Sequence, residues 1–433
     1  MTVAALPLPP RAGAAAPGTG LATDGAPPFL LPGEHFAAAL AWYAVGAAGL
    51  IVVAPLLAAG GFAAPHVVAV AHCFTLGWIT TSIFGALYQL FPVVLGVPAR
   101  SVRVGHLTFA ALQAGNVAMV AGFWWFRPGL LAAGWVLLCG AVGGLAWNLL
   151  PQRRRASRGR LIGLYVSGAH LGLGLAMLVA AARVGNLLGW WNVDALHLLA
   201  AHVHLAALGF ATLTAVGVGG RLLPMFLLSH GHPEWPLRWI GPLAGAGLVV
   251  FGAGELGAGP VLTLCGAALM AASMAFYLYQ AWEYLRHRAR RRLDPGLALA
   301  AASHGFLLLA LAAGVALAVA RGLPPRLVAV YGVLGILGWL SLFIAGIYQK
   351  ILPFLTWLHR FGPRVGEEGL PKVADLSIPA WGWTSLALLG AGTLLLVAGV
   401  GAGGAGAARI GALVFAGGAA FLVAQGVRLR TVR

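Results

Sequence analysis

Residues 76–92 read LGWITTSIFGALYQLFP, residues 208–224 read LGFATLTAVGVGGRLLP, and residues 337–353 read LGWLSLFIAGIYQKILP. In each stretch an aromatic residue follows the LG pair, a second glycine comes seven residues after the aromatic, and a proline seven residues after that glycine. A histidine stands five residues before the first glycine in two copies, as His72 and His204, whereas the third copy has Val333 there. Three related units, two of which carry a histidine at one equivalent position, indicate a pseudo-symmetric scaffold that binds a metal or a haem.

The composition places this chain in a lipid bilayer. Of its 433 residues, 60% are hydrophobic and 9% are charged, and the mean hydropathy is +0.90. A water-soluble domain cannot bury so much apolar surface. Lipid cannot satisfy free backbone groups, and no run alternates as barrel strands do, so we predict an all-α integral membrane protein. About twelve apolar runs are long enough to cross a bilayer, near residues 36–59, 64–95, 105–126, 129–150, 160–183, 195–228, 237–255, 258–284, 297–320, 327–357, 379–400 and 404–426.

The net charge of +17 is distributed unevenly. With twelve spans, one face holds both termini and the loops after the even-numbered spans, and about 20 of the 27 Lys and Arg residues fall on that face. Two arginine clusters, within residues 153–160 and 286–292, account for half of these. The asymmetry predicts that both termini are cytoplasmic. The basic loops are expected to contact anionic lipid headgroups, and nucleic acid is not an expected partner.

The repeats divide the chain into three units of four spans. If the repeated pattern marks spans two, six and ten, the units cover residues 35–155, 156–290 and 291–426, within one transmembrane domain. Residues 1–34 are rich in proline, alanine and glycine and are expected to form a disordered cytoplasmic tail, and residues 427–433 a second tail. The chain contains no CxxCH sequence, which excludes covalent c-type haem.

His72 and His204 are the first candidate ligands. At 1.5 Å per residue, His72 lies ~15 Å deep in the membrane, and His204 is expected at a comparable depth. An imidazole there needs a hydrogen bond or a metal, and neutral imidazole is a common ligand of haem iron and of copper. The alternative is a structural histidine bonded to a backbone carbonyl.

Further histidines lie in the spans of the second and third units. Span six contains His197, His202 and His204; the first and last share a helix face, and His202 points nearly opposite. His197 lies nearer the outer surface and is a candidate to hold a second metal or a haem propionate, or to have no ligand. His202 is a candidate ligand or a helix-contact residue. His170 and His304, in spans five and nine, are candidate second axial ligands or copper ligands. Solvated or interfacial positions are expected for the other seven histidines, namely His35, His66, His106, His230, His232, His287 and His359.

These features resemble the haem–copper oxidase subunit I superfamily. The HxxxLGW segment at 72–78, followed by FGALYQLFP, is similar to the second-span haem motif of cbb-type oxidases and nitric oxide reductases. The spacing also resembles that of the NnrS family, bacterial membrane proteins that contain haem and copper and are associated with nitric oxide stress. The resemblance implies that His72 is an axial haem ligand and that His204 and His202 are haem or copper ligands. It departs from true oxidases in span seven, residues 237–255, which has no histidine.

The sequence and the resemblance together predict a bacterial cytoplasmic-membrane protein that binds b-type haem, with copper as a further candidate cofactor. The expected role is in nitric oxide stress or respiratory redox physiology, with nitric oxide or oxygen as ligand and an electron donor as partner. Two alternatives stay open: a nitric oxide or oxygen reductase, and a transporter of copper or haem. No catalytic residue is assigned.

Overall fold

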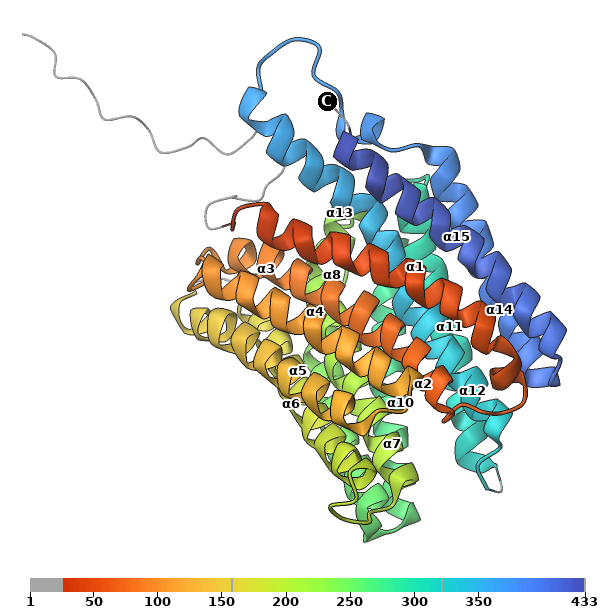
Figure 1. Ribbon diagram of the computed structural model, residues 1–433. Helices are drawn as coiled ribbons and strands as arrows, with labels where there is room; N and C mark the ends of the chain where they lie inside the picture. The colour runs from red at the N-terminus through yellow and green to blue at the C-terminus, as the bar shows by residue number, and fades with distance from the viewer. Residues whose placement is uncertain (1–25, 157–158, 321, 432–433) are drawn as a thin grey trace, which may run out of the picture.

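The computed structural model describes residues 26–156, 159–320 and 322–431, and these residues form helices without any sheet (Figure 1). Twelve helices in the described residues are long and apolar enough to cross a membrane, which confirms the predicted number. They are Leu30–Ala58, Pro65–Leu95, Val102–Trp124, Pro128–Arg155, Arg160–Leu187, Ala195–Leu227, Trp235–Ala258, Pro260–Arg286, Pro295–Val319, Pro325–Arg360, Pro379–Ala402 and Ala405–Thr431. The chain is therefore a multi-pass integral membrane protein.

Three of these spans lie at the centre of the bundle, and they carry the repeated sequence. We call Pro65–Leu95, Ala195–Leu227 and Pro325–Arg360 the central spans. They are the longest, with 31, 33 and 36 residues against 23–29 for the other nine spans of the described chain. Their most apolar windows are also the most buried, at 72%, 50% and 56%, against 28–44% elsewhere. Extra length and central burial are consistent with helices that cross the bilayer at a tilt.

Each central span is interrupted by a π-helical segment at the same register. In the first, η1 (Cys73–Thr80) separates α2 (Pro65–His72) from α3 (Thr81–Leu95). The other two follow the same order, with η3 (Leu205–Thr212) between α7 (Ala195–His204) and α8 (Leu213–Leu227), and η5 (Leu334–Ser341) between α12 (Pro325–Val333) and α13 (Leu342–Arg360). Every π segment begins three residues before the repeated LG pair and ends on the fourth residue after that leucine. Because π segments are rare and often mark functional sites, their shared register indicates that the repeat encodes a common backbone shape.

At the first glycine of each repeat, the central span closely approaches the span that precedes it in sequence. A Cβ atom at Gly77 would lie 2.5 Å from the ring of Trp42 in α1 (Leu30–Ala58). A Cβ atom at Gly338 would lie 2.8 Å from Phe306 in α11 (Pro295–Val319). In the second unit the contact is between backbones, since a Cβ atom at Gly172 of α6 (Arg160–Leu187) would lie 2.5 Å from the carbonyl oxygen of Gly209. Small residues that let helices approach in this way are typical of membrane bundles.

The remaining spans surround the central ones. Besides α1, α6 and α11, they comprise α4 (Val102–Trp124), α5 (Pro128–Leu149) with η2 (Leu150–Arg155), α9 (Trp235–Ala253) with η4 (Gly254–Ala258), α10 (Pro260–Arg286), α14 (Pro379–Ala402) and α15 (Ala405–Thr431). Two short 3-10 turns, η6 (Gly362–Arg364) and η7 (Val373–Leu376), lie in the connection between α13 and α14. Packing between sequence neighbours is extensive for the pairs α4–α5, α9–α10 and α14–α15.

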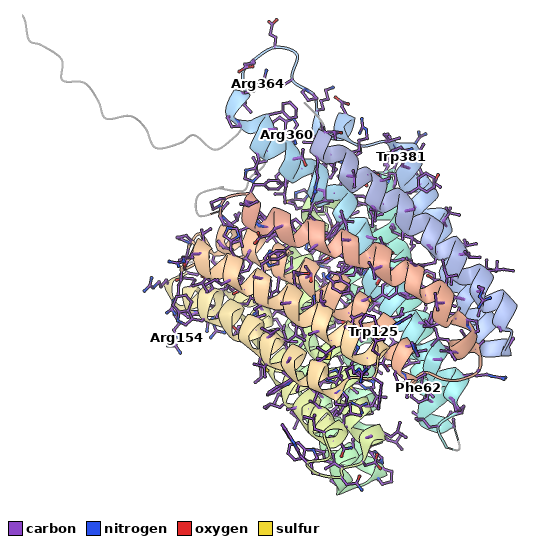
Figure 2. All side chains as sticks on the ribbon, viewed as in Figure 1. Phe62, Trp125, Arg154, Arg360, Arg364 and Trp381 are labelled. Carbon is purple, nitrogen blue, oxygen red and sulfur yellow. The ribbon has the colours of Figure 1, made fainter. Side chains whose placement is uncertain are left out.

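One end of the bundle carries the start of the first span and the ends of the even-numbered spans. Phe29, just before α1, contacts the ring of His359 at the end of span ten with a centroid distance of 4.7 Å. Arg360 donates to the carbonyl oxygen of Arg430 at the end of span twelve, at 2.8 Å. Arg154, Arg360 and Arg364 are seen towards this end in Figure 2, and Phe62 and Trp125 towards the opposite one. We call the first end the basic face.

The first and last helices extend into the two regions that were expected to be tails. α1 begins at Leu30 and α15 continues to Thr431, so the residues adjoining the membrane domain are helical where tails had been expected. Most of the expected N-terminal tail, residues 1–25, and the final residues 432–433 lie outside the described residues.

Candidate functional site

The π segments determine where two candidate ligands stand. His72 is the last residue of α2 and His204 the last residue of α7, each directly before a π segment. His72 Nδ1 lies 2.7 Å from the carbonyl oxygen of Val68, and His204 Nδ1 lies 2.8 Å from that of Ala200. A carbonyl oxygen can only accept, so Nδ1 carries the proton in both rings and Nε2 carries the lone pair. A hydrogen bond that fixes the tautomer in this way is typical of metal-binding histidines.

The surroundings of His72 come from α4, α6 and α7. The ring stacks on Phe123 of α4 with a centroid distance of 5.0 Å. The ring is half-buried. His202 of α7 and Arg183 of α6 are close enough to interact with it electrostatically.

His202 has the same protonation pattern as His72 and comes from a different unit. Its Nδ1 lies 3.0 Å from the carbonyl oxygen of Ala176, so its lone pair is also on Nε2. Beside both rings, Arg183 donates to the carbonyl oxygen of Ala195, and none of the ion pairs in the described chain includes it. Both imidazoles thus lie within electrostatic range of a cation that has no carboxylate partner among the described residues.

The Nε2 atom of His204 has a hydrogen-bond partner in α12, which belongs to span ten. The hydroxyl of Tyr331 in α12 lies 3.1 Å from Nε2 and must donate, because Nδ1 already carries the proton. The ring also contacts Phe251 with a centroid distance of 4.7 Å. Tyr331 stands two residues before Val333, which is buried at the position that His72 and His204 hold in their copies. The third copy therefore supplies a hydrogen-bond donor to the second copy's histidine.

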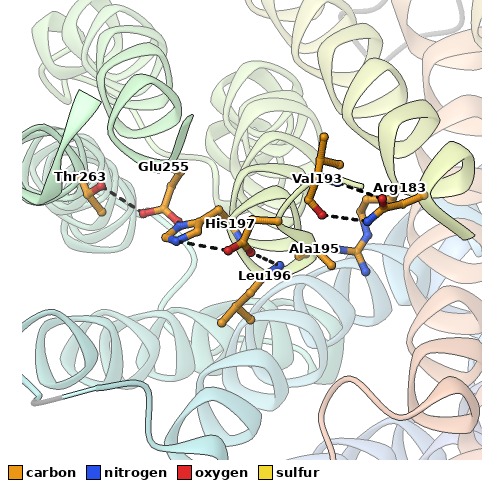
Figure 3. Close-up of polar contacts among 9 residues, drawn as sticks. Arg183, Val193, Ala195, Leu196, His197, Glu255 and Thr263 are labelled. Carbon is orange, nitrogen blue, oxygen red and sulfur yellow. Dashed lines mark hydrogen bonds and ion pairs between the residues drawn. The ribbon is translucent and has the colours of Figure 1, made fainter. Parts of the chain in front are cut away.

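His197 belongs to a separate surface group at the outer end of span six (Figure 3). Its Nδ1 lies 2.9 Å from a carboxylate oxygen of Glu255, and its Nε2 lies 4.0 Å from Asp194. Thr263 donates to the other oxygen of Glu255 at 3.1 Å. Asp194 also caps α7 by accepting from the backbone N–H groups of Leu196 and His197, and these hydrogen bonds lower the pKa of its carboxyl. The two carboxylates lie on opposite sides of the ring, so they do not form one metal site with it.

His170 and His304 occupy two further environments. His170 is 5% exposed and its Nδ1 donates to Val166 at 2.7 Å, whereas its buried Nε2 has no partner among the described residues. His304 donates from Nδ1 to Ala300 at 2.8 Å and accepts at Nε2 from the hydroxyl of Tyr277 at 3.1 Å. The candidate histidines thus lie in several separate environments. His72 and His202 are the pair that interacts electrostatically between two different central spans.

No group of three or more histidine, cysteine, aspartate or glutamate side chains is placed to hold a metal ion within the described part of the chain. Axial ligation of a haem iron requires one or two imidazoles, and the His72–His202 pair meets that requirement. A copper site of three side chains would need a donor set that the described residues do not bring together. In the number and type of donor atoms, the residues therefore suit haem better than such a copper site.

Sequence reasoning missed several residues of these sites. His35 was expected at the solvated edge of span one, and this was wrong: the ring is 0% exposed and contacts Tyr88 and Phe109. The other six histidines expected in such positions are exposed or half-buried. Arg183 was not singled out, although a charged residue inside an apolar run is a signal that could have identified it. Tyr331 was noted only as standing in span ten where a ligand would be sought.

Comparison with known proteins adds no family assignment, since no protein-family model matches the chain and no curated protein is similar to it.

Proposed function

We propose that this chain is a membrane haem protein with a scaffold like that of haem–copper oxidase subunit I. The twelve spans would form three four-helix units, with the arginine clusters at the unit boundaries and both termini in the cytoplasm of a bacterium. The shared register of the three π segments and the matching glycine contacts support the three-unit arrangement. The concentration of arginine on the basic face supports the orientation.

The observation that carries the proposal is that His72 and His202 lie within electrostatic range of each other. They come from different units, both have the proton on Nδ1, and both are close to Arg183. Iron binds the unprotonated nitrogen of an imidazole, so both rings are in the protonation state that an axial ligand needs. We assign His72 as the first axial ligand and His202 as the second.

The other residues define what the site would bind and exclude. The Arg183 guanidinium would pair with a carboxylate of the porphyrin, since it has no acidic partner among the described residues. Phe123 covers one face of the His72 ring. His204, bonded to Tyr331, would stand beside the site rather than ligate in this arrangement.

A bound b-type haem would supply one-electron redox chemistry and a binding position for a diatomic molecule such as nitric oxide. The residues of this chain would hold the two imidazoles neutral and oriented, and would pair the charge of the porphyrin. The proposed role is in nitric oxide or respiratory redox physiology. No step through copper is derived, because the described residues do not supply its donors.

The test is the haem content of purified variants. Wild-type protein expressed with ample haem precursor should show a Soret band. His72→Ala and His202→Ala should each reduce haem per polypeptide roughly ten-fold or more, because even loss of a residue that supports a metal ligand costs ~10–100-fold in metal affinity. His230→Ala removes an exposed histidine and is the matched control. Colourless wild-type protein, or full haem content in both ligand variants, would contradict the proposal.

A further inference from the structure

A partly open cavity of about 70 Å³ lies between the three central spans, and neither His72 nor His202 lines it. Its walls come mainly from α3, α8 and α13, with Phe36 of α1 at one side. Ser82, on its wall, is ten residues beyond His72, which places the cavity roughly 15 Å closer to the basic face. The cavity is thus a separate feature from the candidate haem site.

The wall is built from equivalent positions of the three repeats. Six residues after the leucine of each LG pair stand Ser82, Thr214 and Phe343, and ten residues after it stand Ala86, Val218 and Ile347. The positions seven and fourteen residues after that leucine also line the cavity in all three copies. The cavity therefore lies where the three repeats face one another, and small side chains such as Ala86 leave space there.

The wall offers no free hydrogen-bonding group. The hydroxyl oxygen of Ser82 lies 2.7 Å from that of Tyr348, so these two residues satisfy each other. Thr214 donates to the carbonyl oxygen of Phe210 at 2.8 Å. None of the lining residues carries a buried polar atom that lacks a partner among the described residues. A buried water needs about two to four polar partners, so this cavity favours an apolar occupant over water.

The volume limits the size of that occupant. A single water needs about 10–15 Å³ of such space, whereas a dry cavity of about 150 Å³ holds benzene or xenon. A cavity of about 70 Å³ therefore suits a molecule of a few heavy atoms at most. A porphyrin or a phospholipid headgroup is excluded by size and by the lack of polar partners.

We propose that this cavity is a binding site for one small, uncharged, apolar molecule, such as a dissolved diatomic gas. The inference goes beyond haem binding and does not depend on it, since none of the lining residues is a candidate ligand. Apolar walls from all three repeats would hold the molecule by dispersion contacts, which are strong where the surroundings are densely packed.

Xenon is the probe. Crystals of the full chain pressurised with xenon should show one xenon atom between α3, α8 and α13. Val218→Phe fills the cavity and should reduce xenon occupancy at least roughly five-fold, whereas Val249→Phe, the same substitution at a valine that is 69% exposed, should leave it unchanged. Ala86→Leu fills the same space from another span and is the test variant to use if Val218→Phe does not fold.

Three results would overturn the inference: no xenon at this place in the wild type, ordered water or a lipid chain there instead, or full occupancy in the filled variant. Each can be distinguished from failure of the haem proposal, because the Soret band is measured independently on the same protein.

Discussion

The three central spans have opposite chemistry on the two sides of their π segments. On the side of α2, α7 and α12 they carry polar rings, and His72, His204 and Tyr331 use backbone or side-chain partners from other helices or from the preceding turn. On the side of α3, α8 and α13 the same spans enclose a cavity whose hydroxyls are all satisfied. The backbone is similar in all three copies, and the side chains decide the chemistry. A repeated frame can therefore carry a polar site at one end and a dry one at the other.

The largest expected effect comes from disturbing the close helix packing at a π segment, on which both sides of the central spans depend. Gly172→Val should prevent recovery of folded protein or destabilise it by about 1–3 kcal/mol, because a Cβ atom there meets the backbone of Gly209. Gly168→Val is the matched control on the same helix, since a Cβ atom at Gly168 has nothing within 4 Å. Size-exclusion profiles and thermal unfolding in detergent measure both. Equal behaviour of the two variants would show that the close contact is not needed.

A second prediction sharpens the assignment on the histidine side. Arg183→Gln should weaken haem retention roughly ten-fold, because a charged hydrogen bond to a carboxylate contributes about 1.5–3 kcal/mol. Arg183→Lys keeps the charge and should recover part of the loss. The measurement is haem transfer to apomyoglobin. An unchanged transfer rate in Arg183→Gln would show that this cation does not pair with the porphyrin.

The third prediction concerns the contact between the second and third repeats. Tyr331→Phe removes the donor to His204 Nε2 and should lower the free energy of unfolding by about 0.5–1.5 kcal/mol. Tyr43→Phe is the control: its buried hydroxyl has no hydrogen-bond partner among the described residues, so its removal should be neutral or stabilising. Thermal unfolding of the two variants side by side provides the comparison, and greater destabilisation by Tyr43→Phe would contradict it.

The smallest effect is expected at the basic face, outside the membrane. Burial lowers the pKa of His232 below its ordinary value, and nearby His287 and His230 lower it further, against the opposing carboxylates of Glu234 and Glu283. The unfolded chain therefore binds this proton more readily, so the contribution of His232 to stability is present above about pH 6.5 and is lost as the pH falls below it. His232→Asn should reduce the loss of thermal stability between pH 7.5 and 5.5. The same loss in wild type and variant would count against this role.

Much of the fold was predictable from local sequence. The number and places of the spans follow from hydropathy, because each span must satisfy its own backbone in lipid. The repeated LG pattern marked the three spans that lie at the centre. The expectation that His35 is solvated failed for a tertiary reason: the ring is covered by Tyr88 and Phe109 from other spans. Gly85 is also close, since a Cβ atom there would lie 2.8 Å from the Cβ atom of His35.

The candidate site was predictable only in part. His72, His202 and His204 were identified as polar groups in apolar spans, because burying such a ring without a partner is costly. Which of them meet could not be deduced, since this depends on how spans of different units rotate against one another. His204 is bonded to Tyr331, 127 positions further along the chain, and His72 lies near His202 rather than engaging His204.

The sequence by itself determined that this chain crosses a membrane about twelve times and that three spans share one design, since both properties depend on composition and spacing along the chain. Only the tertiary structure decided that the shared design includes a π-helical segment, which imidazoles lie together, and that three apolar helix faces leave a cavity between them. Packing between distant spans sets these features, and the shape of a helix interface depends on all of its side chains together.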